Sequence, residues 1–347
     1  MKKQPDHLKR NSTRLLYCPD AARASRNRPD APETRVIEPL DVDLSPEESH
    51  HALHVLRLGA GERVRLFDGR GTFYDGVIAE VGRNRVSVRL DHSFPSDAEP
   101  RTPLILLVAQ LKEKAADLLI QKSVELGVAE LTFFPAARSV PRSRPGKGEA
   151  ASPLYRTLDP TRRAATPRPQ SPNSELRTPS SEIGTPAPEL GAPSLEIPMS
   201  RERWDRIVIS ASKQCGRAWL MPVCIHPSLD AALHAVPEGA TRFVFWEGKE
   251  PESRDSPEAP PPRRESLDPE SPTPDPRSPT PDSRSPVPRP ICAMIGPEGG
   301  FTEEEIGRVR RAGFLARSLG PRILRAETAA LAAAAILLHE AGELGDL

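Results

Sequence analysis

The stretch Ile295-Gly296-Pro297-Glu298-Gly299-Gly300 is the most informative part of this sequence. It directly follows the apolar run 291–295, which is typical of a buried parallel strand. Thr302 then stands as the N-cap of a helix with acids in its first turn and arginines in its last. In open α/β sheets ligands bind beyond the carboxyl ends of the strands, and glycines let the backbone approach them. The stretch is therefore either a ligand-binding loop or a structural turn, and it matches neither G-x-G-x-x-G nor a Walker loop.

A second Gly-Pro turn occurs in Leu319-Gly320-Pro321-Arg322-Ile323-Leu324-Arg325-Ala326-Glu327-Thr328-Ala329. We expect it to join a short strand over 314–319 to an Ala/Leu-rich helix over 328–340 that packs in the core. Glu327 and Thr328 are either binding residues or caps of that helix. Both turns should lie at the same edge of one sheet, because the carboxyl ends of parallel strands meet there.

Strands and helices alternate throughout residues 101–347, which predicts an α/β domain with a parallel sheet. We expect strands over 104–109, 131–134, 243–246 and 291–295, and helices over 112–126, 203–214 and 302–312. Residues 13–95 have a different pattern. A short strand over 15–17, a helix over 46–58 and three strands over 63–67, 72–79 and 85–90 predict a small, mostly β barrel-like domain. Ser45 is expected as the N-cap of its helix, with Glu48 completing a capping box.

Two proline-rich segments, 141–200 and 250–290, interrupt the second domain. Proline fixes φ and removes a backbone donor, so neither a helix nor a sheet can run through them. We interpret both as disordered insertions, either simple surface-loop expansions or carriers of Ser-Pro and Thr-Pro phosphorylation sites and polyproline ligands.

Composition restricts the function further. Lys+Arg and Asp+Glu are balanced at 48 each, which excludes a protein that is basic all over but not one with a local basic face. The 4 cysteines form no CxxC pair and favour a reduced cytoplasmic protein. We find no signal peptide and no membrane-spanning run. His50, His51 and His54 have no suitably spaced partner, so no metal site is expected.

Five motifs in order resemble the ribosomal RNA small-subunit methyltransferase E family of the SPOUT superfamily. GPEGG-F-T-x-x-E and LGPRILR-x-ETA are the two turns described above. QKSVELG over 121–127, QCGR over 214–217, and VLR with LFDG over 55–69 match upstream family segments. The resemblance covers nearly all of the chain outside the two insertions.

The resemblance implies a PUA-like RNA-binding β-barrel over 13–95 and a knotted SPOUT methyltransferase domain over 101–347. It also implies a homodimer that uses S-adenosylmethionine to methylate N3 of one uridine in 16S rRNA of the small ribosomal subunit. The residues implied for the cofactor are Glu247, Ile295, Gly296, Pro297, Glu298, Gly299, Gly300, Leu319, Gly320, Leu324, Arg325, Thr328 and Ala329.

Arg14 and Glu327 are the catalytic candidates that the resemblance suggests, because uracil N3 carries a proton that must leave before it attacks a methyl group. Arg14 would either act across the dimer or be an arginine of the surface that contacts phosphate. Lys122, Arg217 and Arg57 are expected to contact RNA phosphates, which position a substrate without reading its sequence.

Three other functions remain open. The protein could be a SPOUT methyltransferase acting on a ribose 2′-hydroxyl or on transfer RNA, or a non-catalytic RNA-binding protein with this fold. A nucleotide-binding dehydrogenase is disfavoured, because no fingerprint loop or ribose-binding acid is suitably placed.

Overall fold

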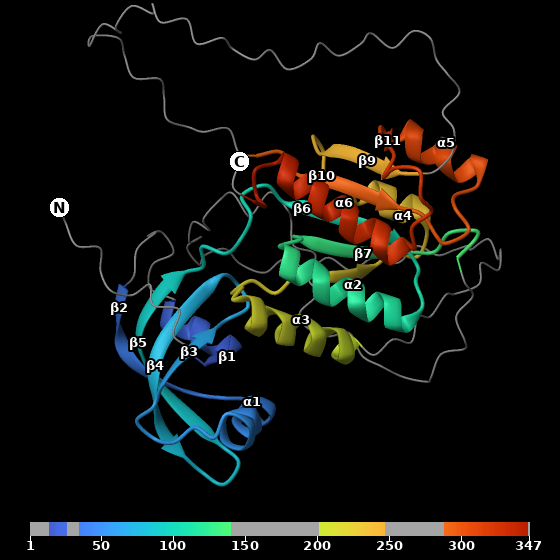
Figure 1. The fold of residues 1–347 in the computed structure, drawn as a ribbon. Helices are drawn as coiled ribbons and strands as arrows, with labels where there is room; N and C mark the ends of the chain where they lie inside the picture. The colour runs from blue at the N-terminus through green and yellow to red at the C-terminus, as the bar shows by residue number, and fades with distance from the viewer. Residues whose placement is uncertain (1–13, 26–34, 140–200, 247–287, 346–347) are drawn as a thin grey trace, which may run out of the picture.

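A computed structural model describes residues 14–25, 35–139, 201–246 and 288–345. Two sheets organise these residues (Figure 1). The smaller sheet has the order β1-β3-β4-β5-β2 and the larger one the order β11-β9-β10-β6-β7-β8. The two segments expected to be disordered lie outside the described residues, apart from 288–290.

The smaller sheet is antiparallel except for the parallel pair β1–β3. Its strands are β1 (Leu15–Tyr17), β2 (Arg35–Asp43), β3 (Arg63–Phe67), β4 (Thr72–Val81) and β5 (Val86–Pro95). A 3-10 helix, η2 (Pro19–Ser25), and the consecutive helices α1 (Pro46–His50) and η3 (His51–Val55) pack beside it. We call residues 14–95 the β module.

The prediction for the β module is confirmed for its helix start and for all four predicted strands, which are β1, β3, β4 and β5, but two details were wrong. Ser45 does cap α1, because its hydroxyl accepts a hydrogen bond from the backbone N–H of Glu48. The Glu48 side chain does not complete a capping box. It instead accepts hydrogen bonds from the Tyr17 backbone and from Lys213 of the other domain. Strand β2 was not predicted.

The larger sheet is parallel in every strand pair. Its strands are β6 (Leu104–Ala109), β7 (Glu130–Phe134), β8 (Val223–Ile225), β9 (Thr241–Phe245), β10 (Ile291–Ile295) and β11 (Leu315–Arg317). The helices are α2 (Glu113–Leu126), α3 (Arg201–Cys215), α4 (Leu229–His234), α5 (Glu303–Arg311) and α6 (Ala326–Glu340). The predicted α/β architecture is confirmed, and β8 and α4 are additions to it.

Both faces of the larger sheet are covered, which explains why its strands read as continuous apolar runs. Every residue of β6 is buried, and successive side chains point to opposite faces. One face packs against α2, α3 and α6, and the other against α4 and α5 (Figure 1). This arrangement leaves the carboxyl edge of the sheet as the place where loops, rather than helices, meet solvent.

Helix α3 joins the two parts of the protein. Lys213 Nζ lies 2.7 Å from Glu48 Oε1 of α1 in a largely buried ion pair. Nearby, Gly69 forms a bridge with Trp219, and a Cβ on Gly69 would lie 2.9 Å from the Leu220 side chain. The LFDG turn that contains Gly69 therefore needs glycine, because its backbone lies directly against the second domain and has a φ of +77°.

Candidate active site at the carboxyl edge of the parallel sheet

Four of the loops that leave the carboxyl edge of the larger sheet carry the candidate residues or their contacts. They follow β6, β7, β10 and β11, and two of them are the glycine-containing turns singled out in the sequence. We call residues 296–300 the first glycine loop and residues 318–325 the second. In the strand order, β9 alone separates β10 from β11, so both loops leave the same edge of the sheet. The ends of β9 and β11 are also joined, because the Trp246 N–H donates to Arg317 O at 3.3 Å.

The first glycine loop is tightly packed on its inner side. A Cβ on Gly296 would lie 3.0 Å from the Phe301 ring, and one on Gly299 would lie 3.0 Å from Cβ of Arg138. Gly300 has a φ of +71°, and its N–H donates to Pro297 O at 2.8 Å. Glycine is therefore favoured by conformation at 300, whereas a Cβ at 296 or 299 would have to displace the Phe301 ring or the Arg138 side chain slightly.

Both flanks of the first glycine loop are held by side chains from other elements. Arg138 donates to the Gly299 carbonyl at 3.1 Å, and Lys112 Nζ lies 4.0 Å from Glu298 Oε2. Thr302 and Glu305 form a complete capping box at the start of α5. Glu305 also accepts a hydrogen bond from the Ala137 N–H at 2.8 Å, which ties the loop after β7 to this helix.

The second glycine loop is more open. Gly320 has a φ of +99° with free space around it, and Ile323 is 84% exposed. Arg325 is the N-cap of α6 but makes no side-chain cap hydrogen bond. Below the loop, Arg317 forms a two-armed ion pair with Glu340, at 2.7 and 2.8 Å, which ties the end of β11 to the end of α6.

Two buried polar atoms near this edge have no partner among the described residues. They are Oε2 of Glu327, in the first turn of α6, and Nε2 of Gln110, directly after β6. An unpaired buried donor or acceptor costs free energy, and such atoms in a fold are often completed by a ligand. Gln110 was missed in the sequence, where nothing distinguishes it from the end of an apolar strand.

The other predicted site residues are dispersed. Glu247 lies outside the described residues. Arg14 lies in the β module, where its guanidinium pairs with Glu62 at 3.3 Å. Lys122 pairs with Glu125 on the surface of α2, and Arg57 is exposed in the left-handed conformation, with a φ of 56°.

Arg217 does not fit the predicted contact with RNA phosphate. Its side chain is 3% exposed and forms an ion pair with Glu99 at 2.7 Å. It also donates to the carbonyls of Val124 and Val128 at the end of α2. All three guanidinium nitrogens thus donate to groups of the protein itself. The residue holds Glu99, in the segment between the two domains, against the end of α2. The QCGR motif could be recognised in the sequence, but the burial of the Arg217 side chain could not be predicted from it.

Metal and membrane sites can also be assessed. Over the described ranges, no group of three His, Cys, Asp or Glu side chains is arranged to hold a metal ion. The rings of His50 and His54 contact each other at a tilt of 44°, with their centroids 4.6 Å apart. No helix in the described part of the chain is long and apolar enough to cross a membrane.

Comparison with known families decides the assignment of this fold. The model of the RNA methyltransferase domain matches residues 98–152 and 195–338, and that of the RNA methyltransferase PUA domain matches residues 44–91. This chain belongs to the RNA methyltransferase family. The family resemblance inferred from the motifs is thereby confirmed.

Individual relatives agree with the family. The ribosomal RNA small subunit methyltransferase E of Buchnera aphidicola is 24% identical over 314 residues, covering 87% of this chain and 92% of the relative. The crystal structure of the enzyme of that name from Neisseria gonorrhoeae, bound to S-adenosyl methionine, matches with a TM-score of 0.57 and 24% identity, covering 94% of this chain and 98% of that one. A probable rRNA-methyltransferase from Porphyromonas gingivalis matches with a TM-score of 0.59 and 22% identity, covering 94% and 97%.

Proposed function

We propose that this protein is an S-adenosylmethionine-dependent methyltransferase that methylates N3 of a specific uridine in 16S rRNA. The observation that carries the proposal is the carboxyl edge: both glycine loops leave it, and the second loop leads directly to Glu327, whose Oε2 has no partner among the described residues. The names of its relatives, and the S-adenosyl methionine bound to one of them, support the choice of cofactor and substrate.

The residues at this edge fit the cofactor. The first glycine loop offers backbone groups beside glycines at which a Cβ would have to displace Phe301 or Arg138 slightly. The proposed binding residues of the first loop are Ile295 and Gly296 to Gly300. The second loop contributes Leu319, Gly320, Leu324 and Arg325, with Thr328 and Ala329 at the start of α6. Glu247 is retained from the sequence as a further candidate.

The bound cofactor supplies a methyl group that is already activated by its sulfonium centre, so the protein contributes position and proton transfer. Holding the nucleophile in line within about 3–3.5 Å of the methyl carbon gives a large part of the rate advantage. We assign Glu327 to the N3 proton, because its Oε2 is buried and has no partner among the described residues. A carboxylate in that position accepts a proton or holds the uracil in register.

Arg14 requires a second copy of the chain. It belongs to the β module and not to the loops of the carboxyl edge. In the proposed homodimer, it approaches the site of the partner and stabilises negative charge on the uracil as the N3 proton leaves. The dimer, the trefoil knot, the cytoplasmic location and the domain limits 13–95 and 101–347 are parts of the same proposal.

Product mapping tests the proposed function. Small ribosomal subunits from a strain lacking this protein, incubated with the purified protein and labelled S-adenosylmethionine, should gain one N3-methyluridine in 16S rRNA, located by nuclease digestion and mass spectrometry. A label on a ribose 2′-oxygen or on transfer RNA would replace the substrate assignment with another one in the same superfamily. Absence of S-adenosylmethionine binding in calorimetry would leave a non-catalytic RNA-binding protein.

A further inference from the structure

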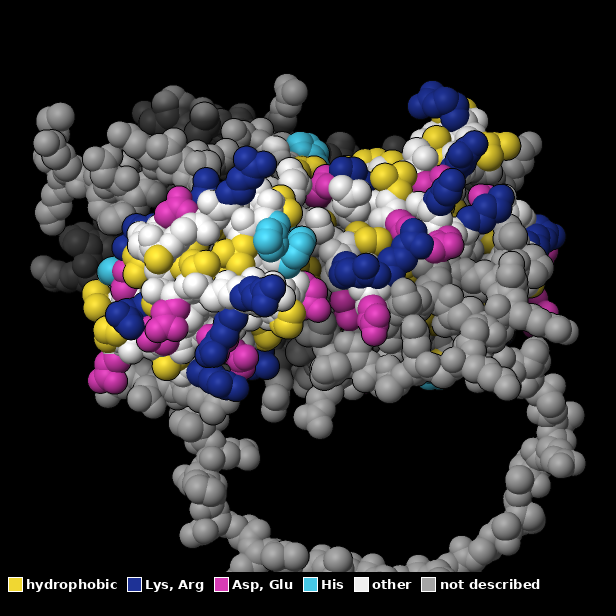
Figure 2. Space-filling model, turned by 90° about the horizontal axis from the view of Figure 1, so that it is seen from below, with side chains coloured by type: hydrophobic (Ala, Val, Ile, Leu, Met, Phe, Trp, Pro, Cys, Tyr) yellow, Lys and Arg dark blue, Asp and Glu magenta, His cyan; other side chains and the backbone are white. Residues whose placement is uncertain are grey.

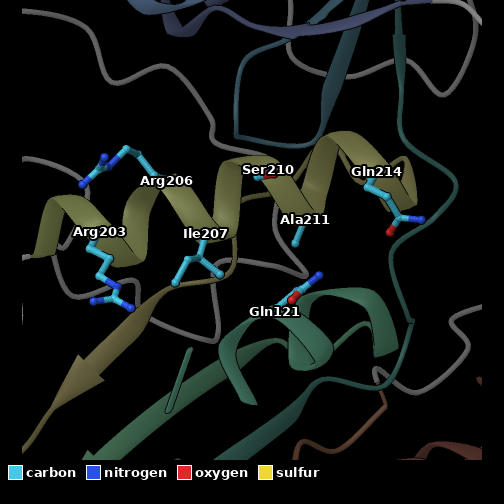
Figure 3. A pocket seen from close by; sticks show the side chains of 7 residues that line it. All are labelled: Gln121, Arg203, Arg206, Ile207, Ser210, Ala211 and Gln214. Atoms are coloured by element: carbon cyan, nitrogen blue, oxygen red, sulfur yellow. The ribbon is translucent and has the colours of Figure 1, made fainter. Parts of the chain in front are cut away.

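A hollow of about 610 Å³ lies between α2 and α3, outside the two glycine loops. Figure 3 shows that Gln121 points from α2 toward α3, while Arg203, Ile207 and Ala211 point from α3 toward α2. Arg206 stands on the rim and points away from α2. The hollow is open to solvent on one side, and its volume leaves room for a group the size of a base.

The charge around this hollow is nearly balanced. Arg203 forms ion pairs with Glu113 and Asp117 of α2, which neutralise it. Arg206 donates to the backbone carbonyl of Glu202 at 3.3 Å and has no ion pair among the residues that the structure describes. A site with one unpaired cation does not favour a row of phosphates. A single phosphate or the flat face of a base suits one guanidinium better.

The amides of the lining carry the recognition chemistry. Gln121 and Gln214 each present both a donor and an acceptor, as base edges require. Within the described residues neither amide makes a hydrogen bond to another part of the protein. Ile207, which is half-buried, adds an apolar surface against which a base can lie. Sequence-specific proteins bind single-stranded RNA in this way, by stacking a splayed base and hydrogen-bonding its edge.

The hollow also lies between the candidate active site and the β module. At one end, Arg203 contacts Glu113, which directly follows Lys112, the residue near Glu298 of the first glycine loop. At the other end, Gln214 follows Lys213, which pairs with Glu48 of the β module. Figure 2 shows the molecule from below, where Lys and Arg side chains are interspersed with Asp and Glu side chains. An RNA strand held by both parts of the protein would cross this hollow.

We propose that the hollow between α2 and α3 binds an unstacked nucleotide of the substrate RNA next to the target uridine. Gln121 and Gln214 bind the edge of the base, and Arg206 contacts its face or its phosphate. The hollow therefore contributes to the choice of the methylated position and not to the chemical step. This inference rests on the proposed function, because it takes RNA as the substrate.

Steady-state kinetics test the inference. The double variant Arg206→Ala, Gln214→Ala is compared with Arg311→Ala, a control that removes an exposed arginine from α5 on the opposite face of the sheet. The substrates are S-adenosylmethionine and small ribosomal subunits from a strain lacking the protein. We expect KM for the subunits to rise about tenfold or more in the double variant, as for loss of a charged and a neutral hydrogen bond. The kcat and the Kd for S-adenosylmethionine should stay within about twofold, as should all constants of the control.

Photo-crosslinking provides a second measurement that does not depend on a variant. Small-subunit rRNA carrying 4-thiouridine should crosslink to a peptide of α3 in the wild-type protein, located by mass spectrometry. Failure of the proposed function would appear as a wild-type protein that methylates no RNA. Failure of this inference alone would appear as an active wild type with an unchanged KM in the double variant, or as crosslinks that avoid α2 and α3. If the double variant changes sedimentation from dimer to monomer, the hollow is a subunit interface and the inference is wrong.

Discussion

The β module and the carboxyl edge of the larger sheet differ in how completely their polar groups are paired. On the β module, Arg63, Arg65, Arg85 and Arg89 are each paired with an aspartate, at 2.6 to 3.1 Å. At the carboxyl edge, Glu327 and Gln110 have buried atoms with no partner among the described residues. A region rich in arginine is therefore not by itself a region ready to bind RNA, and paired and unpaired groups must be told apart before a site is assigned.

The pairing on the β module follows from strand register. Arg65 lies directly opposite Asp75 on β4, and Arg89 lies opposite Asp41 on β2. Opposite charges at such positions stabilise a sheet. Arg65 additionally lies over the Phe94 ring, 4.6 Å from its centroid. These arginines thus contribute to the fold of the module. Because each is paired with a carboxylate, its charge attracts RNA phosphates less than that of an unpaired arginine would.

The largest effect is expected at Arg217, where a fully paired charge is buried. Arg217→Ala removes the guanidinium that pairs with Glu99 and donates to two carbonyls, and breaking a buried pair in this way costs about 3–5 kcal/mol. The loss should appear as a lower free energy of unfolding in urea, followed by circular dichroism. The exposed Arg206→Ala serves as the matched control and should change the unfolding free energy little. Stability equal to wild type in Arg217→Ala, with weaker RNA binding, would restore the original view of this residue as a phosphate contact.

The next largest effect is expected at Glu327, on the activation free energy of methyl transfer. Glu327→Gln keeps the shape and removes the charge, so we expect kcat to fall about 100-fold, the lower end of what a positioned acid or base contributes. The measurement is methyl transfer to small ribosomal subunits at saturating substrate. Glu303→Gln, which changes an acid in the first turn of α5, is the control and should keep full activity. Full activity in Glu327→Gln would remove the carboxylate from the mechanism.

The smallest effect is expected on the β module. Arg89→Ala removes a cation that Asp41 already neutralises. The hydrogen bond from Arg89 in turn holds the pKa of Asp41 below its usual value. We expect the Kd for the small-subunit RNA to change less than about twofold, because exposed ion pairs contribute little. The dependence of that Kd on salt should also stay the same. A clear loss of salt dependence would show that the arginine binds phosphate in the complex and that the comparison drawn above is wrong.

Sequence patterns predicted the elements with strong local signals. The strand 104–109 and the helix ending at Gly127 occur as expected, because a continuous apolar run and a left-handed glycine are local properties. Strand β2 was missed because Pro39 interrupts its alternation, and the structure has a register shift between Val36 and Leu40. Helix α4 is only 6 residues long and depends on Leu229 and Ala232 packing into the core.

The candidate site was predictable in part for the same reason. Glycine loops after apolar strands can be found in a sequence, and the structure places both at one edge. Which side chains are buried and paired depends on contacts across the whole fold. Lys213 reaches Glu48 over 165 positions of sequence, and Arg217 reaches Glu99 over 118. No local pattern signals such contacts, so the role of Arg217 and the hollow beside α3 emerged only from the structure.

The anchoring of the first glycine loop has a consequence for affinity. The loop begins at β10, which is hydrogen-bonded to strands on both sides, and it ends at the capping box of α5. Its backbone is further restrained by Arg138. The conformational entropy of this segment is therefore lost when the chain folds and not when a ligand arrives, which makes the loop preorganised. Binding to it should accordingly show a small entropic penalty and an association rate that no loop closure slows.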